Sequence, residues 1–348
     1  MRKALTLIAA TAASILLVPV AQAKPLGVLD NIATNTAIHV DGMAEAAWDA
    51  APALTVVLDQ TPYKPNNGYE GISKTTITVR SMHDDKNVYF FLEWDDPTES
   101  LNRFPWIKQS DGSWKQLANK DDTGHDNTYY EDKMSMLWNI NVKAFDKKGC
   151  GAACHMAKGG KQKGMDDKAP GRKYTKPGTT IDMWHWKGVR TNPNAQIDDQ
   201  FIDDNTDPAK NKGWGRHGDA KTGGGYKNNI ADGKPAFVQA DLAADATVVF
   251  DSQKTPYNSD MDEIKRIPGI VTSAFSGSRG DIAAKGVWKD GKWYLEISRP
   301  LVTSGEKADM QDVQFNDLNK SYSFGISVFD NSQINHVYHN GVLNMVFK

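Results

Sequence analysis

Both cysteines of this 348-residue chain lie in one short stretch, KKGCGAACH, where Cys150 and Cys154 are followed at once by His155. In a C-x-x-C-H motif two thiols attach a haem covalently, and the histidine ligates its iron. Here three residues separate the cysteines instead of two. Residues four apart share one face of a helical turn, so both thiols can still reach one edge of a porphyrin. The stretch therefore predicts a c-type haem, with His155 as the proximal iron ligand.

Two other kinds of site use the same residue types. In an oxidising compartment the cysteines could form a disulfide, although so short a loop gains little stability from closure. A zinc site needs three or four protein ligands. Cys150, Cys154 and His155 supply three, and the sequence holds no second Cys/His cluster nearby. The haem interpretation gives a role to all three residues.

A candidate for the second iron ligand follows in the stretch IDMWHWK, residues 181–187. On a strand the side chains alternate between two faces, so Met183, His185 and Lys187 share one face. Trp184 and Trp186 lie on the other. Either His185 or Lys187 could ligate the iron, and the tryptophans beside them could pack on the porphyrin. The alternative for His185 is an ordinary hydrogen-bonded core histidine. If both axial positions are filled, the protein transfers electrons and is not an enzyme.

The elements that would position these residues are mostly strands. Alternating or continuous apolar patterns cover residues 74–80, 87–94, 134–142, 179–187, 246–250, 322–330 and 342–347. Residues 287–297 form a hairpin around Asp290-Gly291, and only residues 43–50 read as a short helix. Strands without alternating helices indicate an all-β, immunoglobulin-like sandwich. It spans residues 24–348 as one domain, with long loop insertions at 97–130, 143–178 and 191–234.

The N-terminus has the pattern of an export signal. A basic start, Arg2-Lys3, is followed by an apolar run and by the small-residue triplet Ala21-Gln22-Ala23. Cleavage after Ala23 would place the mature protein in a periplasm, without stable membrane insertion. It would also remove two basic residues and no acidic one, taking the formal net charge from −2 to −4. So balanced a charge argues against nucleic-acid binding.

Two loops carry opposite charge. Residues 147–176 hold nine basic residues and two acidic ones. Such a basic rim could neutralise haem propionates or attract an acidic redox partner protein, or it could simply pair with the acidic loop. The acidic loop contains Asp198, Asp199, Asp203, Asp204 and Asp207. It could bind calcium, although the D-x-D-x-D-G spacing is absent.

These motifs occur in an order that is similar to a known family. The stretch from Ile38 to Trp48 resembles the opening strand and turn of carbohydrate-module-like and DOMON-like β-sandwiches. Residues 88–97, 131–138, the cysteine motif, 182–187 and 322–330 together resemble the ethylbenzene dehydrogenase-related haem-binding domain.

The resemblance implies a sandwich that carries one haem and passes single electrons. It covers free periplasmic cytochromes and the haem-bearing γ-subunits of periplasmic molybdenum oxidoreductases. In those subunits a b-type haem is held by Met and Lys, and Lys187 matches the lysine. Haem b is therefore the fallback cofactor. A different alternative is a haem-free carbohydrate-binding sandwich with a small disulfide, which the ten tryptophans favour.

Overall fold

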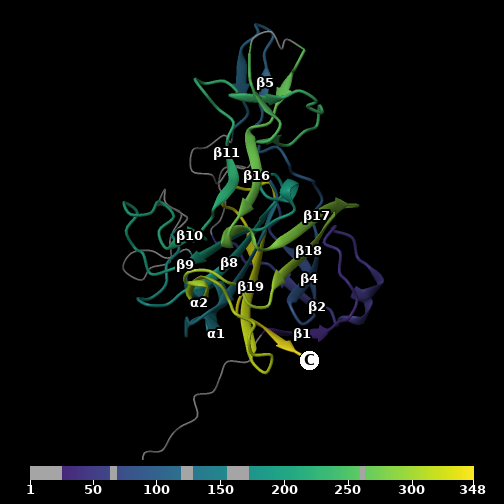
Figure 1. Cartoon of the computed structure of the whole chain (residues 1–348), viewed down its shortest axis with the longest axis vertical. Coiled ribbons are helices and arrows are strands. Elements are labelled where there is room, and N and C mark those ends of the chain that lie inside the picture. The colour runs from purple at the N-terminus through teal and green to yellow at the C-terminus, as the bar shows by residue number, and fades with distance from the viewer. Residues whose placement is uncertain (1–25, 63–68, 119–127, 155–171, 259–262) are drawn as a thin grey trace, which may run out of the picture.

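The computed structural model describes residues 26–62, 69–118, 128–154, 172–258 and 263–348. Within these ranges the chain is almost entirely β-structure (Figure 1). The helical segments described there are short: α1 (Phe145–Lys148), α2 (Ala308–Gln311) and the 3-10 turns η1 (Ala46–Ala50), η2 (Gly149–Ala152), η3 (Asn192–Asn194) and η4 (Ser278–Gly280). The prediction of an all-β fold is confirmed. The predicted signal peptide, residues 1–23, lies outside the described residues.

One thirteen-stranded sheet forms the body of the molecule. Its main path runs β10-β9-β8-β7-β19-β21-β1-β3-β4-β18-β17, with β2 on β3 and β20 on β19. The strands are β1 (Gly27–Ala33), β2 (Leu54–Leu58), β3 (Thr75–His83), β4 (Asn87–Asp95), β7 (Lys133–Asn139), β8 (Ile181–Lys187), β9 (Asp198–Ile202), β10 (Arg216–Gly218), β17 (Ala283–Lys289), β18 (Lys292–Pro300), β19 (Ser321–Phe329), β20 (Val337–Tyr338) and β21 (Leu343–Phe347). Most pairs are antiparallel, but β1 runs parallel to both β21 and β3.

The sheet folds over so that its two halves pack face to face as a sandwich. Phe90 on β4 contacts Trp184 on β8, with ring centroids 5.7 Å apart. Trp186 lies between Trp94 and Trp293, at 6.1 and 4.9 Å. Each buried aromatic side chain removes about 150–250 Å² from water, worth about 4–6 kcal/mol. The inter-sheet layer of tryptophans is therefore a main source of stability.

Strict alternation along β7, β8 and β19 separates this core from the outer face of the sheet. The core-facing residues of these strands are Met134, Met136, Trp138, Trp184, Trp186, Phe324, Ile326 and Val328. The residues between them point outward, as the two-residue period of a strand requires. The outer face is where the candidate site lies.

The two turns predicted with specific geometry have different outcomes. The hairpin β17–β18 turns at Asp290 and Gly291, with φ of 52° and 79°, which confirms the Asp-Gly prediction. The predicted opening strand at residues 38–48 is wrong. The sheet opens with β1, and this segment is a loop ending in η1. The loop is fixed instead by Glu296, whose carboxylate accepts hydrogen bonds from Trp48 Nε1 and from the Gly42 amide, both at 2.9 Å.

The predicted loops at 97–130 and 191–234 contain strands. They contribute to small sheets formed by β5 (Trp106–Lys108), β6 (Trp114–Gln116) and β15 (Arg266–Ile267), and by β11 (Gly223–Asn228), β13 (Val249–Phe250) and β16 (Ile270–Ser276). A third pair is β12 (Phe237–Gln239) with β14 (Lys254–Pro256). In Figure 1 β11 and β16 run from the sandwich toward an extension that ends at β5. No helix among the described residues is long and apolar enough to cross a membrane.

Candidate functional site

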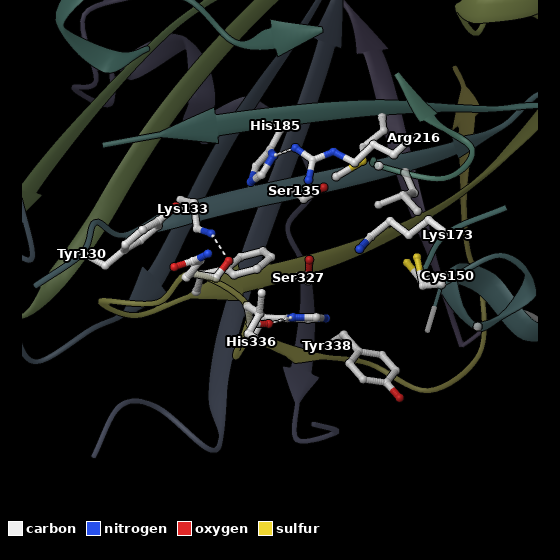
Figure 2. Close-up of a pocket in the computed structure, with 18 of the residues that line it drawn as sticks. Tyr130, Lys133, Ser135, Cys150, Lys173, His185, Arg216, Ser327, His336 and Tyr338 are labelled. Carbon is white, nitrogen blue, oxygen red and sulfur yellow. Dashed lines mark hydrogen bonds between the residues drawn. The ribbon is translucent and has the colours of Figure 1, made fainter. Parts of the chain in front are cut away.

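A cavity of about 320 Å³ lies on the outer face of β7, β8 and β19 (Figure 2). The strands supply its floor, and loops that follow β7, β8, β9 and β19 supply its walls. The residues that line it are Tyr130, Lys133, Ser135, Leu137, Cys150, Gly151, Cys154, Lys173, Met183, His185, Arg190, Lys212, Gly213, Arg216, Ser327, Phe329, Gln333, Ile334, His336 and Tyr338. The cavity thus brings both cysteines together with His185, although His185 lies 31 residues beyond Cys154 in the sequence.

The two cysteines lie one helical turn apart on one wall. The Cys154 amide donates to the Cys150 carbonyl at 3.0 Å, which confirms that the four-residue spacing forms a turn. Both thiols are unpaired in this structure. Burial raises the pKa of both thiols, so neither is a thiolate at neutral pH. Thiols of this kind are weak nucleophiles.

Gly325 on β19 makes room for the first thiol. A Cβ atom at this position would lie 2.4 Å from Cys150 Sγ, far inside contact distance. The strand and the cysteine turn therefore fit closely only because this residue lacks a side chain. His155, the predicted proximal ligand, lies outside the described residues, as does the basic stretch 155–171.

His185 is fully enclosed and points into the cavity, as predicted. Its Nδ1 lies 3.0 Å from a terminal nitrogen of Arg216 (Figure 2). A guanidinium group only donates, so Nδ1 accepts and Nε2 carries the ring hydrogen. Nε2 is buried without a hydrogen-bond partner. Burial, with the Lys187 and Arg216 charges, holds the pKa well below its usual value, so the ring is neutral.

This tautomer changes the role expected of His185. An iron-ligating imidazole offers a lone pair and donates its other N–H to an acceptor. His185 has the reverse arrangement, because its other nitrogen meets a permanent donor. Its Nε2–H suits an anionic oxygen, such as a carboxylate of a bound ligand. The prediction of His185 as distal iron ligand is therefore not supported by this geometry.

Lys187, the other predicted iron ligand, is not among the residues that line the cavity. Its amine is fully buried in an ion pair with Asp198 and donates to the Tyr226 hydroxyl at 3.1 Å. Asp198 also accepts from Arg279 Nε at 2.6 Å and from Gln200 at 2.8 Å. Burial lowers the pKa of Lys187 to about 7, against the opposing pull of Asp198.

The two tryptophans predicted to pack on a porphyrin lie elsewhere. Trp184 and Trp186 are 0% exposed and point into the sandwich core. They alternate with His185 along β8, so the strand itself separates them from the cavity. The aromatic residues on the cavity side are Tyr130, Phe329 and Tyr338.

His336 is the site residue that sequence reasoning missed. Its Nδ1 lies 2.8 Å from the carbonyl oxygen of Ile334. Nδ1 must donate to that carbonyl, which leaves Nε2 as the ring's acceptor nitrogen. Burial lowers the pKa of His336 to about 3, so the ring stays neutral. Its centroid lies 4.6 Å from that of Phe329, which fixes the ring plane. This is the tautomer and support that metal-ligating histidines show.

The cavity carries an excess of positive charge. Five basic side chains line it: Lys133, Lys173, Lys212, Arg190 and Arg216. Burial lowers the pKa of Lys133 well below its usual value and also lowers that of Lys173. Among its described lining residues there is no Asp or Glu. Glu131, behind the wall, pairs with Arg190, and the Lys133 amine donates to the Gln333 carbonyl at 3.0 Å. The remaining charge favours an anionic ligand whose carboxylates can be held by guanidinium and ammonium groups.

The chain is thus a β-sandwich with a cavity lined by basic side chains on the outer face of one half-sheet. A family model described as ethylbenzene dehydrogenase matches residues 45–341, and the chain belongs to this family. No curated protein matches the sequence.

Solved structures of similar architecture are distant. One is a carbohydrate-binding module of family 9 from Caldicellulosiruptor kristjanssonii in complex with cellotriose. It is 8% identical and covers 92% of this chain and 94% of its own, with a TM-score of 0.34. A putative carbohydrate-binding protein from Bacteroides uniformis is also 8% identical, covers 92% and 99%, and has a TM-score of 0.33.

Proposed function

We propose that this protein is an exported electron-transfer protein that holds one haem covalently in the cavity. The observation that carries the proposal is the set of groups that meet there. Two unpaired thiols lie one turn apart, the neutral imidazole of His336 lines the cavity, and five basic side chains surround the same space. A haem requires two thiols at one edge, axial nitrogen or sulfur ligands, and cations for its propionates.

Each group has a distinct role in this proposal. Cys150 and Cys154 form the thioethers, and His155 is the first axial ligand. His336 supplies the second, since its Nδ1–H is already held by a carbonyl. His185 Nε2–H and the guanidinium of Arg216 hold propionate oxygens. Haem supplies reversible transfer of a single electron, and with both axial positions occupied no substrate binds at the iron.

The partners follow from charge and compartment. A periplasmic location rests on the N-terminal signal pattern, and redox proteins with acidic patches suit the cationic rim of the cavity. Lys212 is exposed at that rim, beside the half-buried Gly213. The protein then acts either as a free cytochrome or as the haem subunit of a periplasmic molybdenum oxidoreductase. A pull-down from the periplasm under low salt separates these two contexts.

The carbohydrate-binding alternative rested on the carbohydrate-module-like stretches of the sequence and on abundant tryptophan. Sugar-binding sites stack their ligands on exposed aromatic faces. Eight of the ten tryptophans are buried here, and the other two, Trp114 and Trp288, are half-buried. A cavity with five cations also offers little to a neutral sugar.

The first test is a denaturing gel of the exported protein stained for haem, beside an intact mass. The proposal expects a stained band and a mass raised by about one haem over the chain cut after Ala23. An unstained band with a mass two protons light would mean a disulfide and would overturn the proposal. An unstained band with a haem absorbance in the native protein would mean haem b instead.

The axial ligand is tested by paired variants in the haem-loaded protein. His336→Ala should convert a low-spin spectrum to a high-spin one, and added imidazole should restore it. His185→Ala should keep the low-spin spectrum, because it removes only a propionate donor, and Lys187→Met should do the same. A high-spin spectrum from His185→Ala alone would refute the assignment of His336.

A further inference from the structure

Three buried carboxylates from distant segments meet at one end of the sandwich, on the core side of β9. Asp199 lies on β9, Asp219 directly follows β10, and Asp312 directly follows α2. One oxygen of each lies within 4.8 Å of the others. All three side chains are enclosed, with exposures of 0%, 3% and 1%. Of the acidic stretch noted in the sequence, only Asp199 belongs to this group.

Each carboxylate has one oxygen that is held and one that is not. Asp199 Oδ1 accepts from the Gln200 amide at 3.0 Å. Asp219 Oδ2 accepts from Ser278 Oγ at 3.2 Å, and Asp312 Oδ2 from Thr303 Oγ1 at 2.5 Å. The second oxygen of every one of them is buried without a hydrogen-bond partner. Asp219 and Asp312 lie close enough to share a hydrogen bond when one of them is protonated. When the group is ionised, three unpartnered oxygens in one buried cluster leave a deficit of positive charge.

Both signs of charge surround the group, with acidic residues outnumbering the one arginine that faces it. Asp182 and Asp281 each bring a further buried oxygen without a partner. Arg299 faces this group, with its guanidinium 3.7 Å from Asp182. Arg279, also nearby, is bonded to Asp198 on the other face of β9. Burial and the neighbouring carboxylates raise the pKa of Asp199 and of Asp219. Carboxylates at such density either keep protons or bind a cation, and a bound cation would displace those protons.

A second buried acidic group, Asp96, Asp132 and Asp330, differs in this respect. Asp132 accepts hydrogen bonds from the Ser100 and Asn331 amides, each at 2.7 Å. Asp330 accepts from the Ile72 amide at 2.9 Å. Backbone donors therefore satisfy most of its oxygens, and that group carries no comparable deficit.

We propose that Asp199, Asp219 and Asp312 bind one calcium ion. Carboxylate oxygens are hard ligands, which select Ca²⁺, Mg²⁺ or Mn²⁺. Calcium accepts six to eight oxygen ligands in flexible geometry, whereas magnesium demands a near-ideal octahedron. Magnesium also keeps several of its waters and uses one or two carboxylates. An enclosed site with three carboxylates therefore fits calcium better. The inference stands on residues apart from the cavity and does not depend on haem.

The ion would join segments that also build the cavity. On β9 Asp199 alternates with Gln200, whose amide oxygen accepts from Arg216 Nε at 2.8 Å. Asp219 follows the strand that carries Arg216, and its amide donates to the Asp199 carbonyl at 3.1 Å. A cation bound to both aspartates would therefore stabilise the β9–β10 hairpin on the face opposite the cavity. Through Asp312 it would also link α2 to this hairpin.

The test uses the whole exported protein, stripped with a chelator and then dialysed into metal-free buffer. Titration with CaCl₂ by calorimetry should give one ion per chain. At a hundredfold excess over Kd, the melting temperature should rise by about 5 °C. MgCl₂ at the same concentration should give a smaller rise. An absent calcium effect, or an equal effect of magnesium, would overturn the proposal.

The matched variants are Asp199→Asn and Asp312→Asn, with Asp203→Asn as control. Each of the first two removes a like charge from the stripped site, so its metal-free melting temperature should equal or exceed that of the wild type. Both should lose the calcium-induced rise. The control changes a neighbouring aspartate that pairs with His217 at 31% exposure, and it should keep the rise. A rise retained by Asp199→Asn and lost by Asp330→Asn would place the ion in the other acidic group and refute the assignment.

Discussion

Replacing Asp198 should destabilise the protein far more than replacing its partner Lys187. Asp198 is 0% exposed and accepts from two charged donors, Lys187 and Arg279, and from two neutral ones, Tyr226 and Gln200. Charged hydrogen bonds contribute about 1.5–3 kcal/mol each and neutral ones about 1 kcal/mol, which sums to about 5–8 kcal/mol. Asparagine keeps one acceptor oxygen, enough for about half of the donors. Asp198→Asn should therefore cost about 3–4 kcal/mol, close to the cost of breaking a buried ion pair.

Lys187→Met should cost less than about 1 kcal/mol, because Asp198 keeps Arg279, Tyr226 and Gln200. Burial already disfavours the charged amine, as its pKa of about 7 indicates. Urea unfolding of the mature protein at pH 7, followed by tryptophan fluorescence, gives both free energies of unfolding. Equal losses in the two variants, or a larger loss in Lys187→Met, would refute the ion-pair account. Such a result would return Lys187 to the list of ligand candidates.

Three further predictions concern packing, a turn and pH. Gly325→Ala should cost about 1–3 kcal/mol of stability and lower the yield of covalent haem, since its Cβ would lie 2.4 Å from Cys150 Sγ; adding Cys150→Ala should restore the stability, and no restoration would contradict the clash. Gly291→Ala should lower the free energy of unfolding by about 1 kcal/mol, because alanine disfavours the φ of 79° at this position. Steric overlap plays no part, since no atom lies within 4 Å of the new Cβ. An unchanged melting temperature would argue against the turn. Mainly through burial, Asp182 and Asp219 have pKa values raised to about 8 and about 9. The folded protein thus holds protons that the unfolded chain releases above about pH 4. The urea concentration at the unfolding midpoint, measured in the presence of chelator, should therefore decrease as the pH rises from about 5 to about 9. An increase of the midpoint over that pH range would contradict the raised pKa values of these buried acids. With calcium present the decrease should be smaller.

The alternation of strand residues could be read from the sequence because it depends on local geometry alone. For residues 181–187 the two-residue period was enough to place His185 and Trp184 on opposite faces of the strand, although not to tell which face is the core. The cysteine turn was likewise predictable from its four-residue spacing. These features depend on neighbours in the chain, and the structure confirms both.

Partners that come from elsewhere in the chain were not predictable. Lys187 looked like a ligand until β9 brought Asp198 beside it. His336 follows a correctly predicted strand, but its place in the cavity depends on how the chain turns from β19 toward β20. The tautomer of His185 depends on Arg216, which lies in a stretch read as loop. None of these relations leaves a local signal, since each is set by the register of distant strands.

The first strand was missed for a related reason. Residues 27–33 mix apolar and polar side chains, including Asp30 and Asn31. Asn31 is fully buried, and its side-chain amide donates to Ser81 Oγ at 2.5 Å. Parallel pairing with β21 and β3 stabilises the strand, although its composition is a weak strand pattern. Tertiary pairing outweighed local propensity here.

The alternation along β7, β8 and β19 also bears on how this architecture can diversify. Half of the positions in these strands hold the tryptophan-rich interior, and the other half form the floor of the cavity. Substitutions at the outward positions can alter charge, ligands and specificity while the interior is untouched. A single-residue insertion or deletion in β8 would do the opposite, exchanging tryptophans and charged groups across the sheet at once. Related proteins with this sandwich should therefore differ in ligand through point substitutions at the outward positions. Differences in length should be confined to the loops that form the cavity walls.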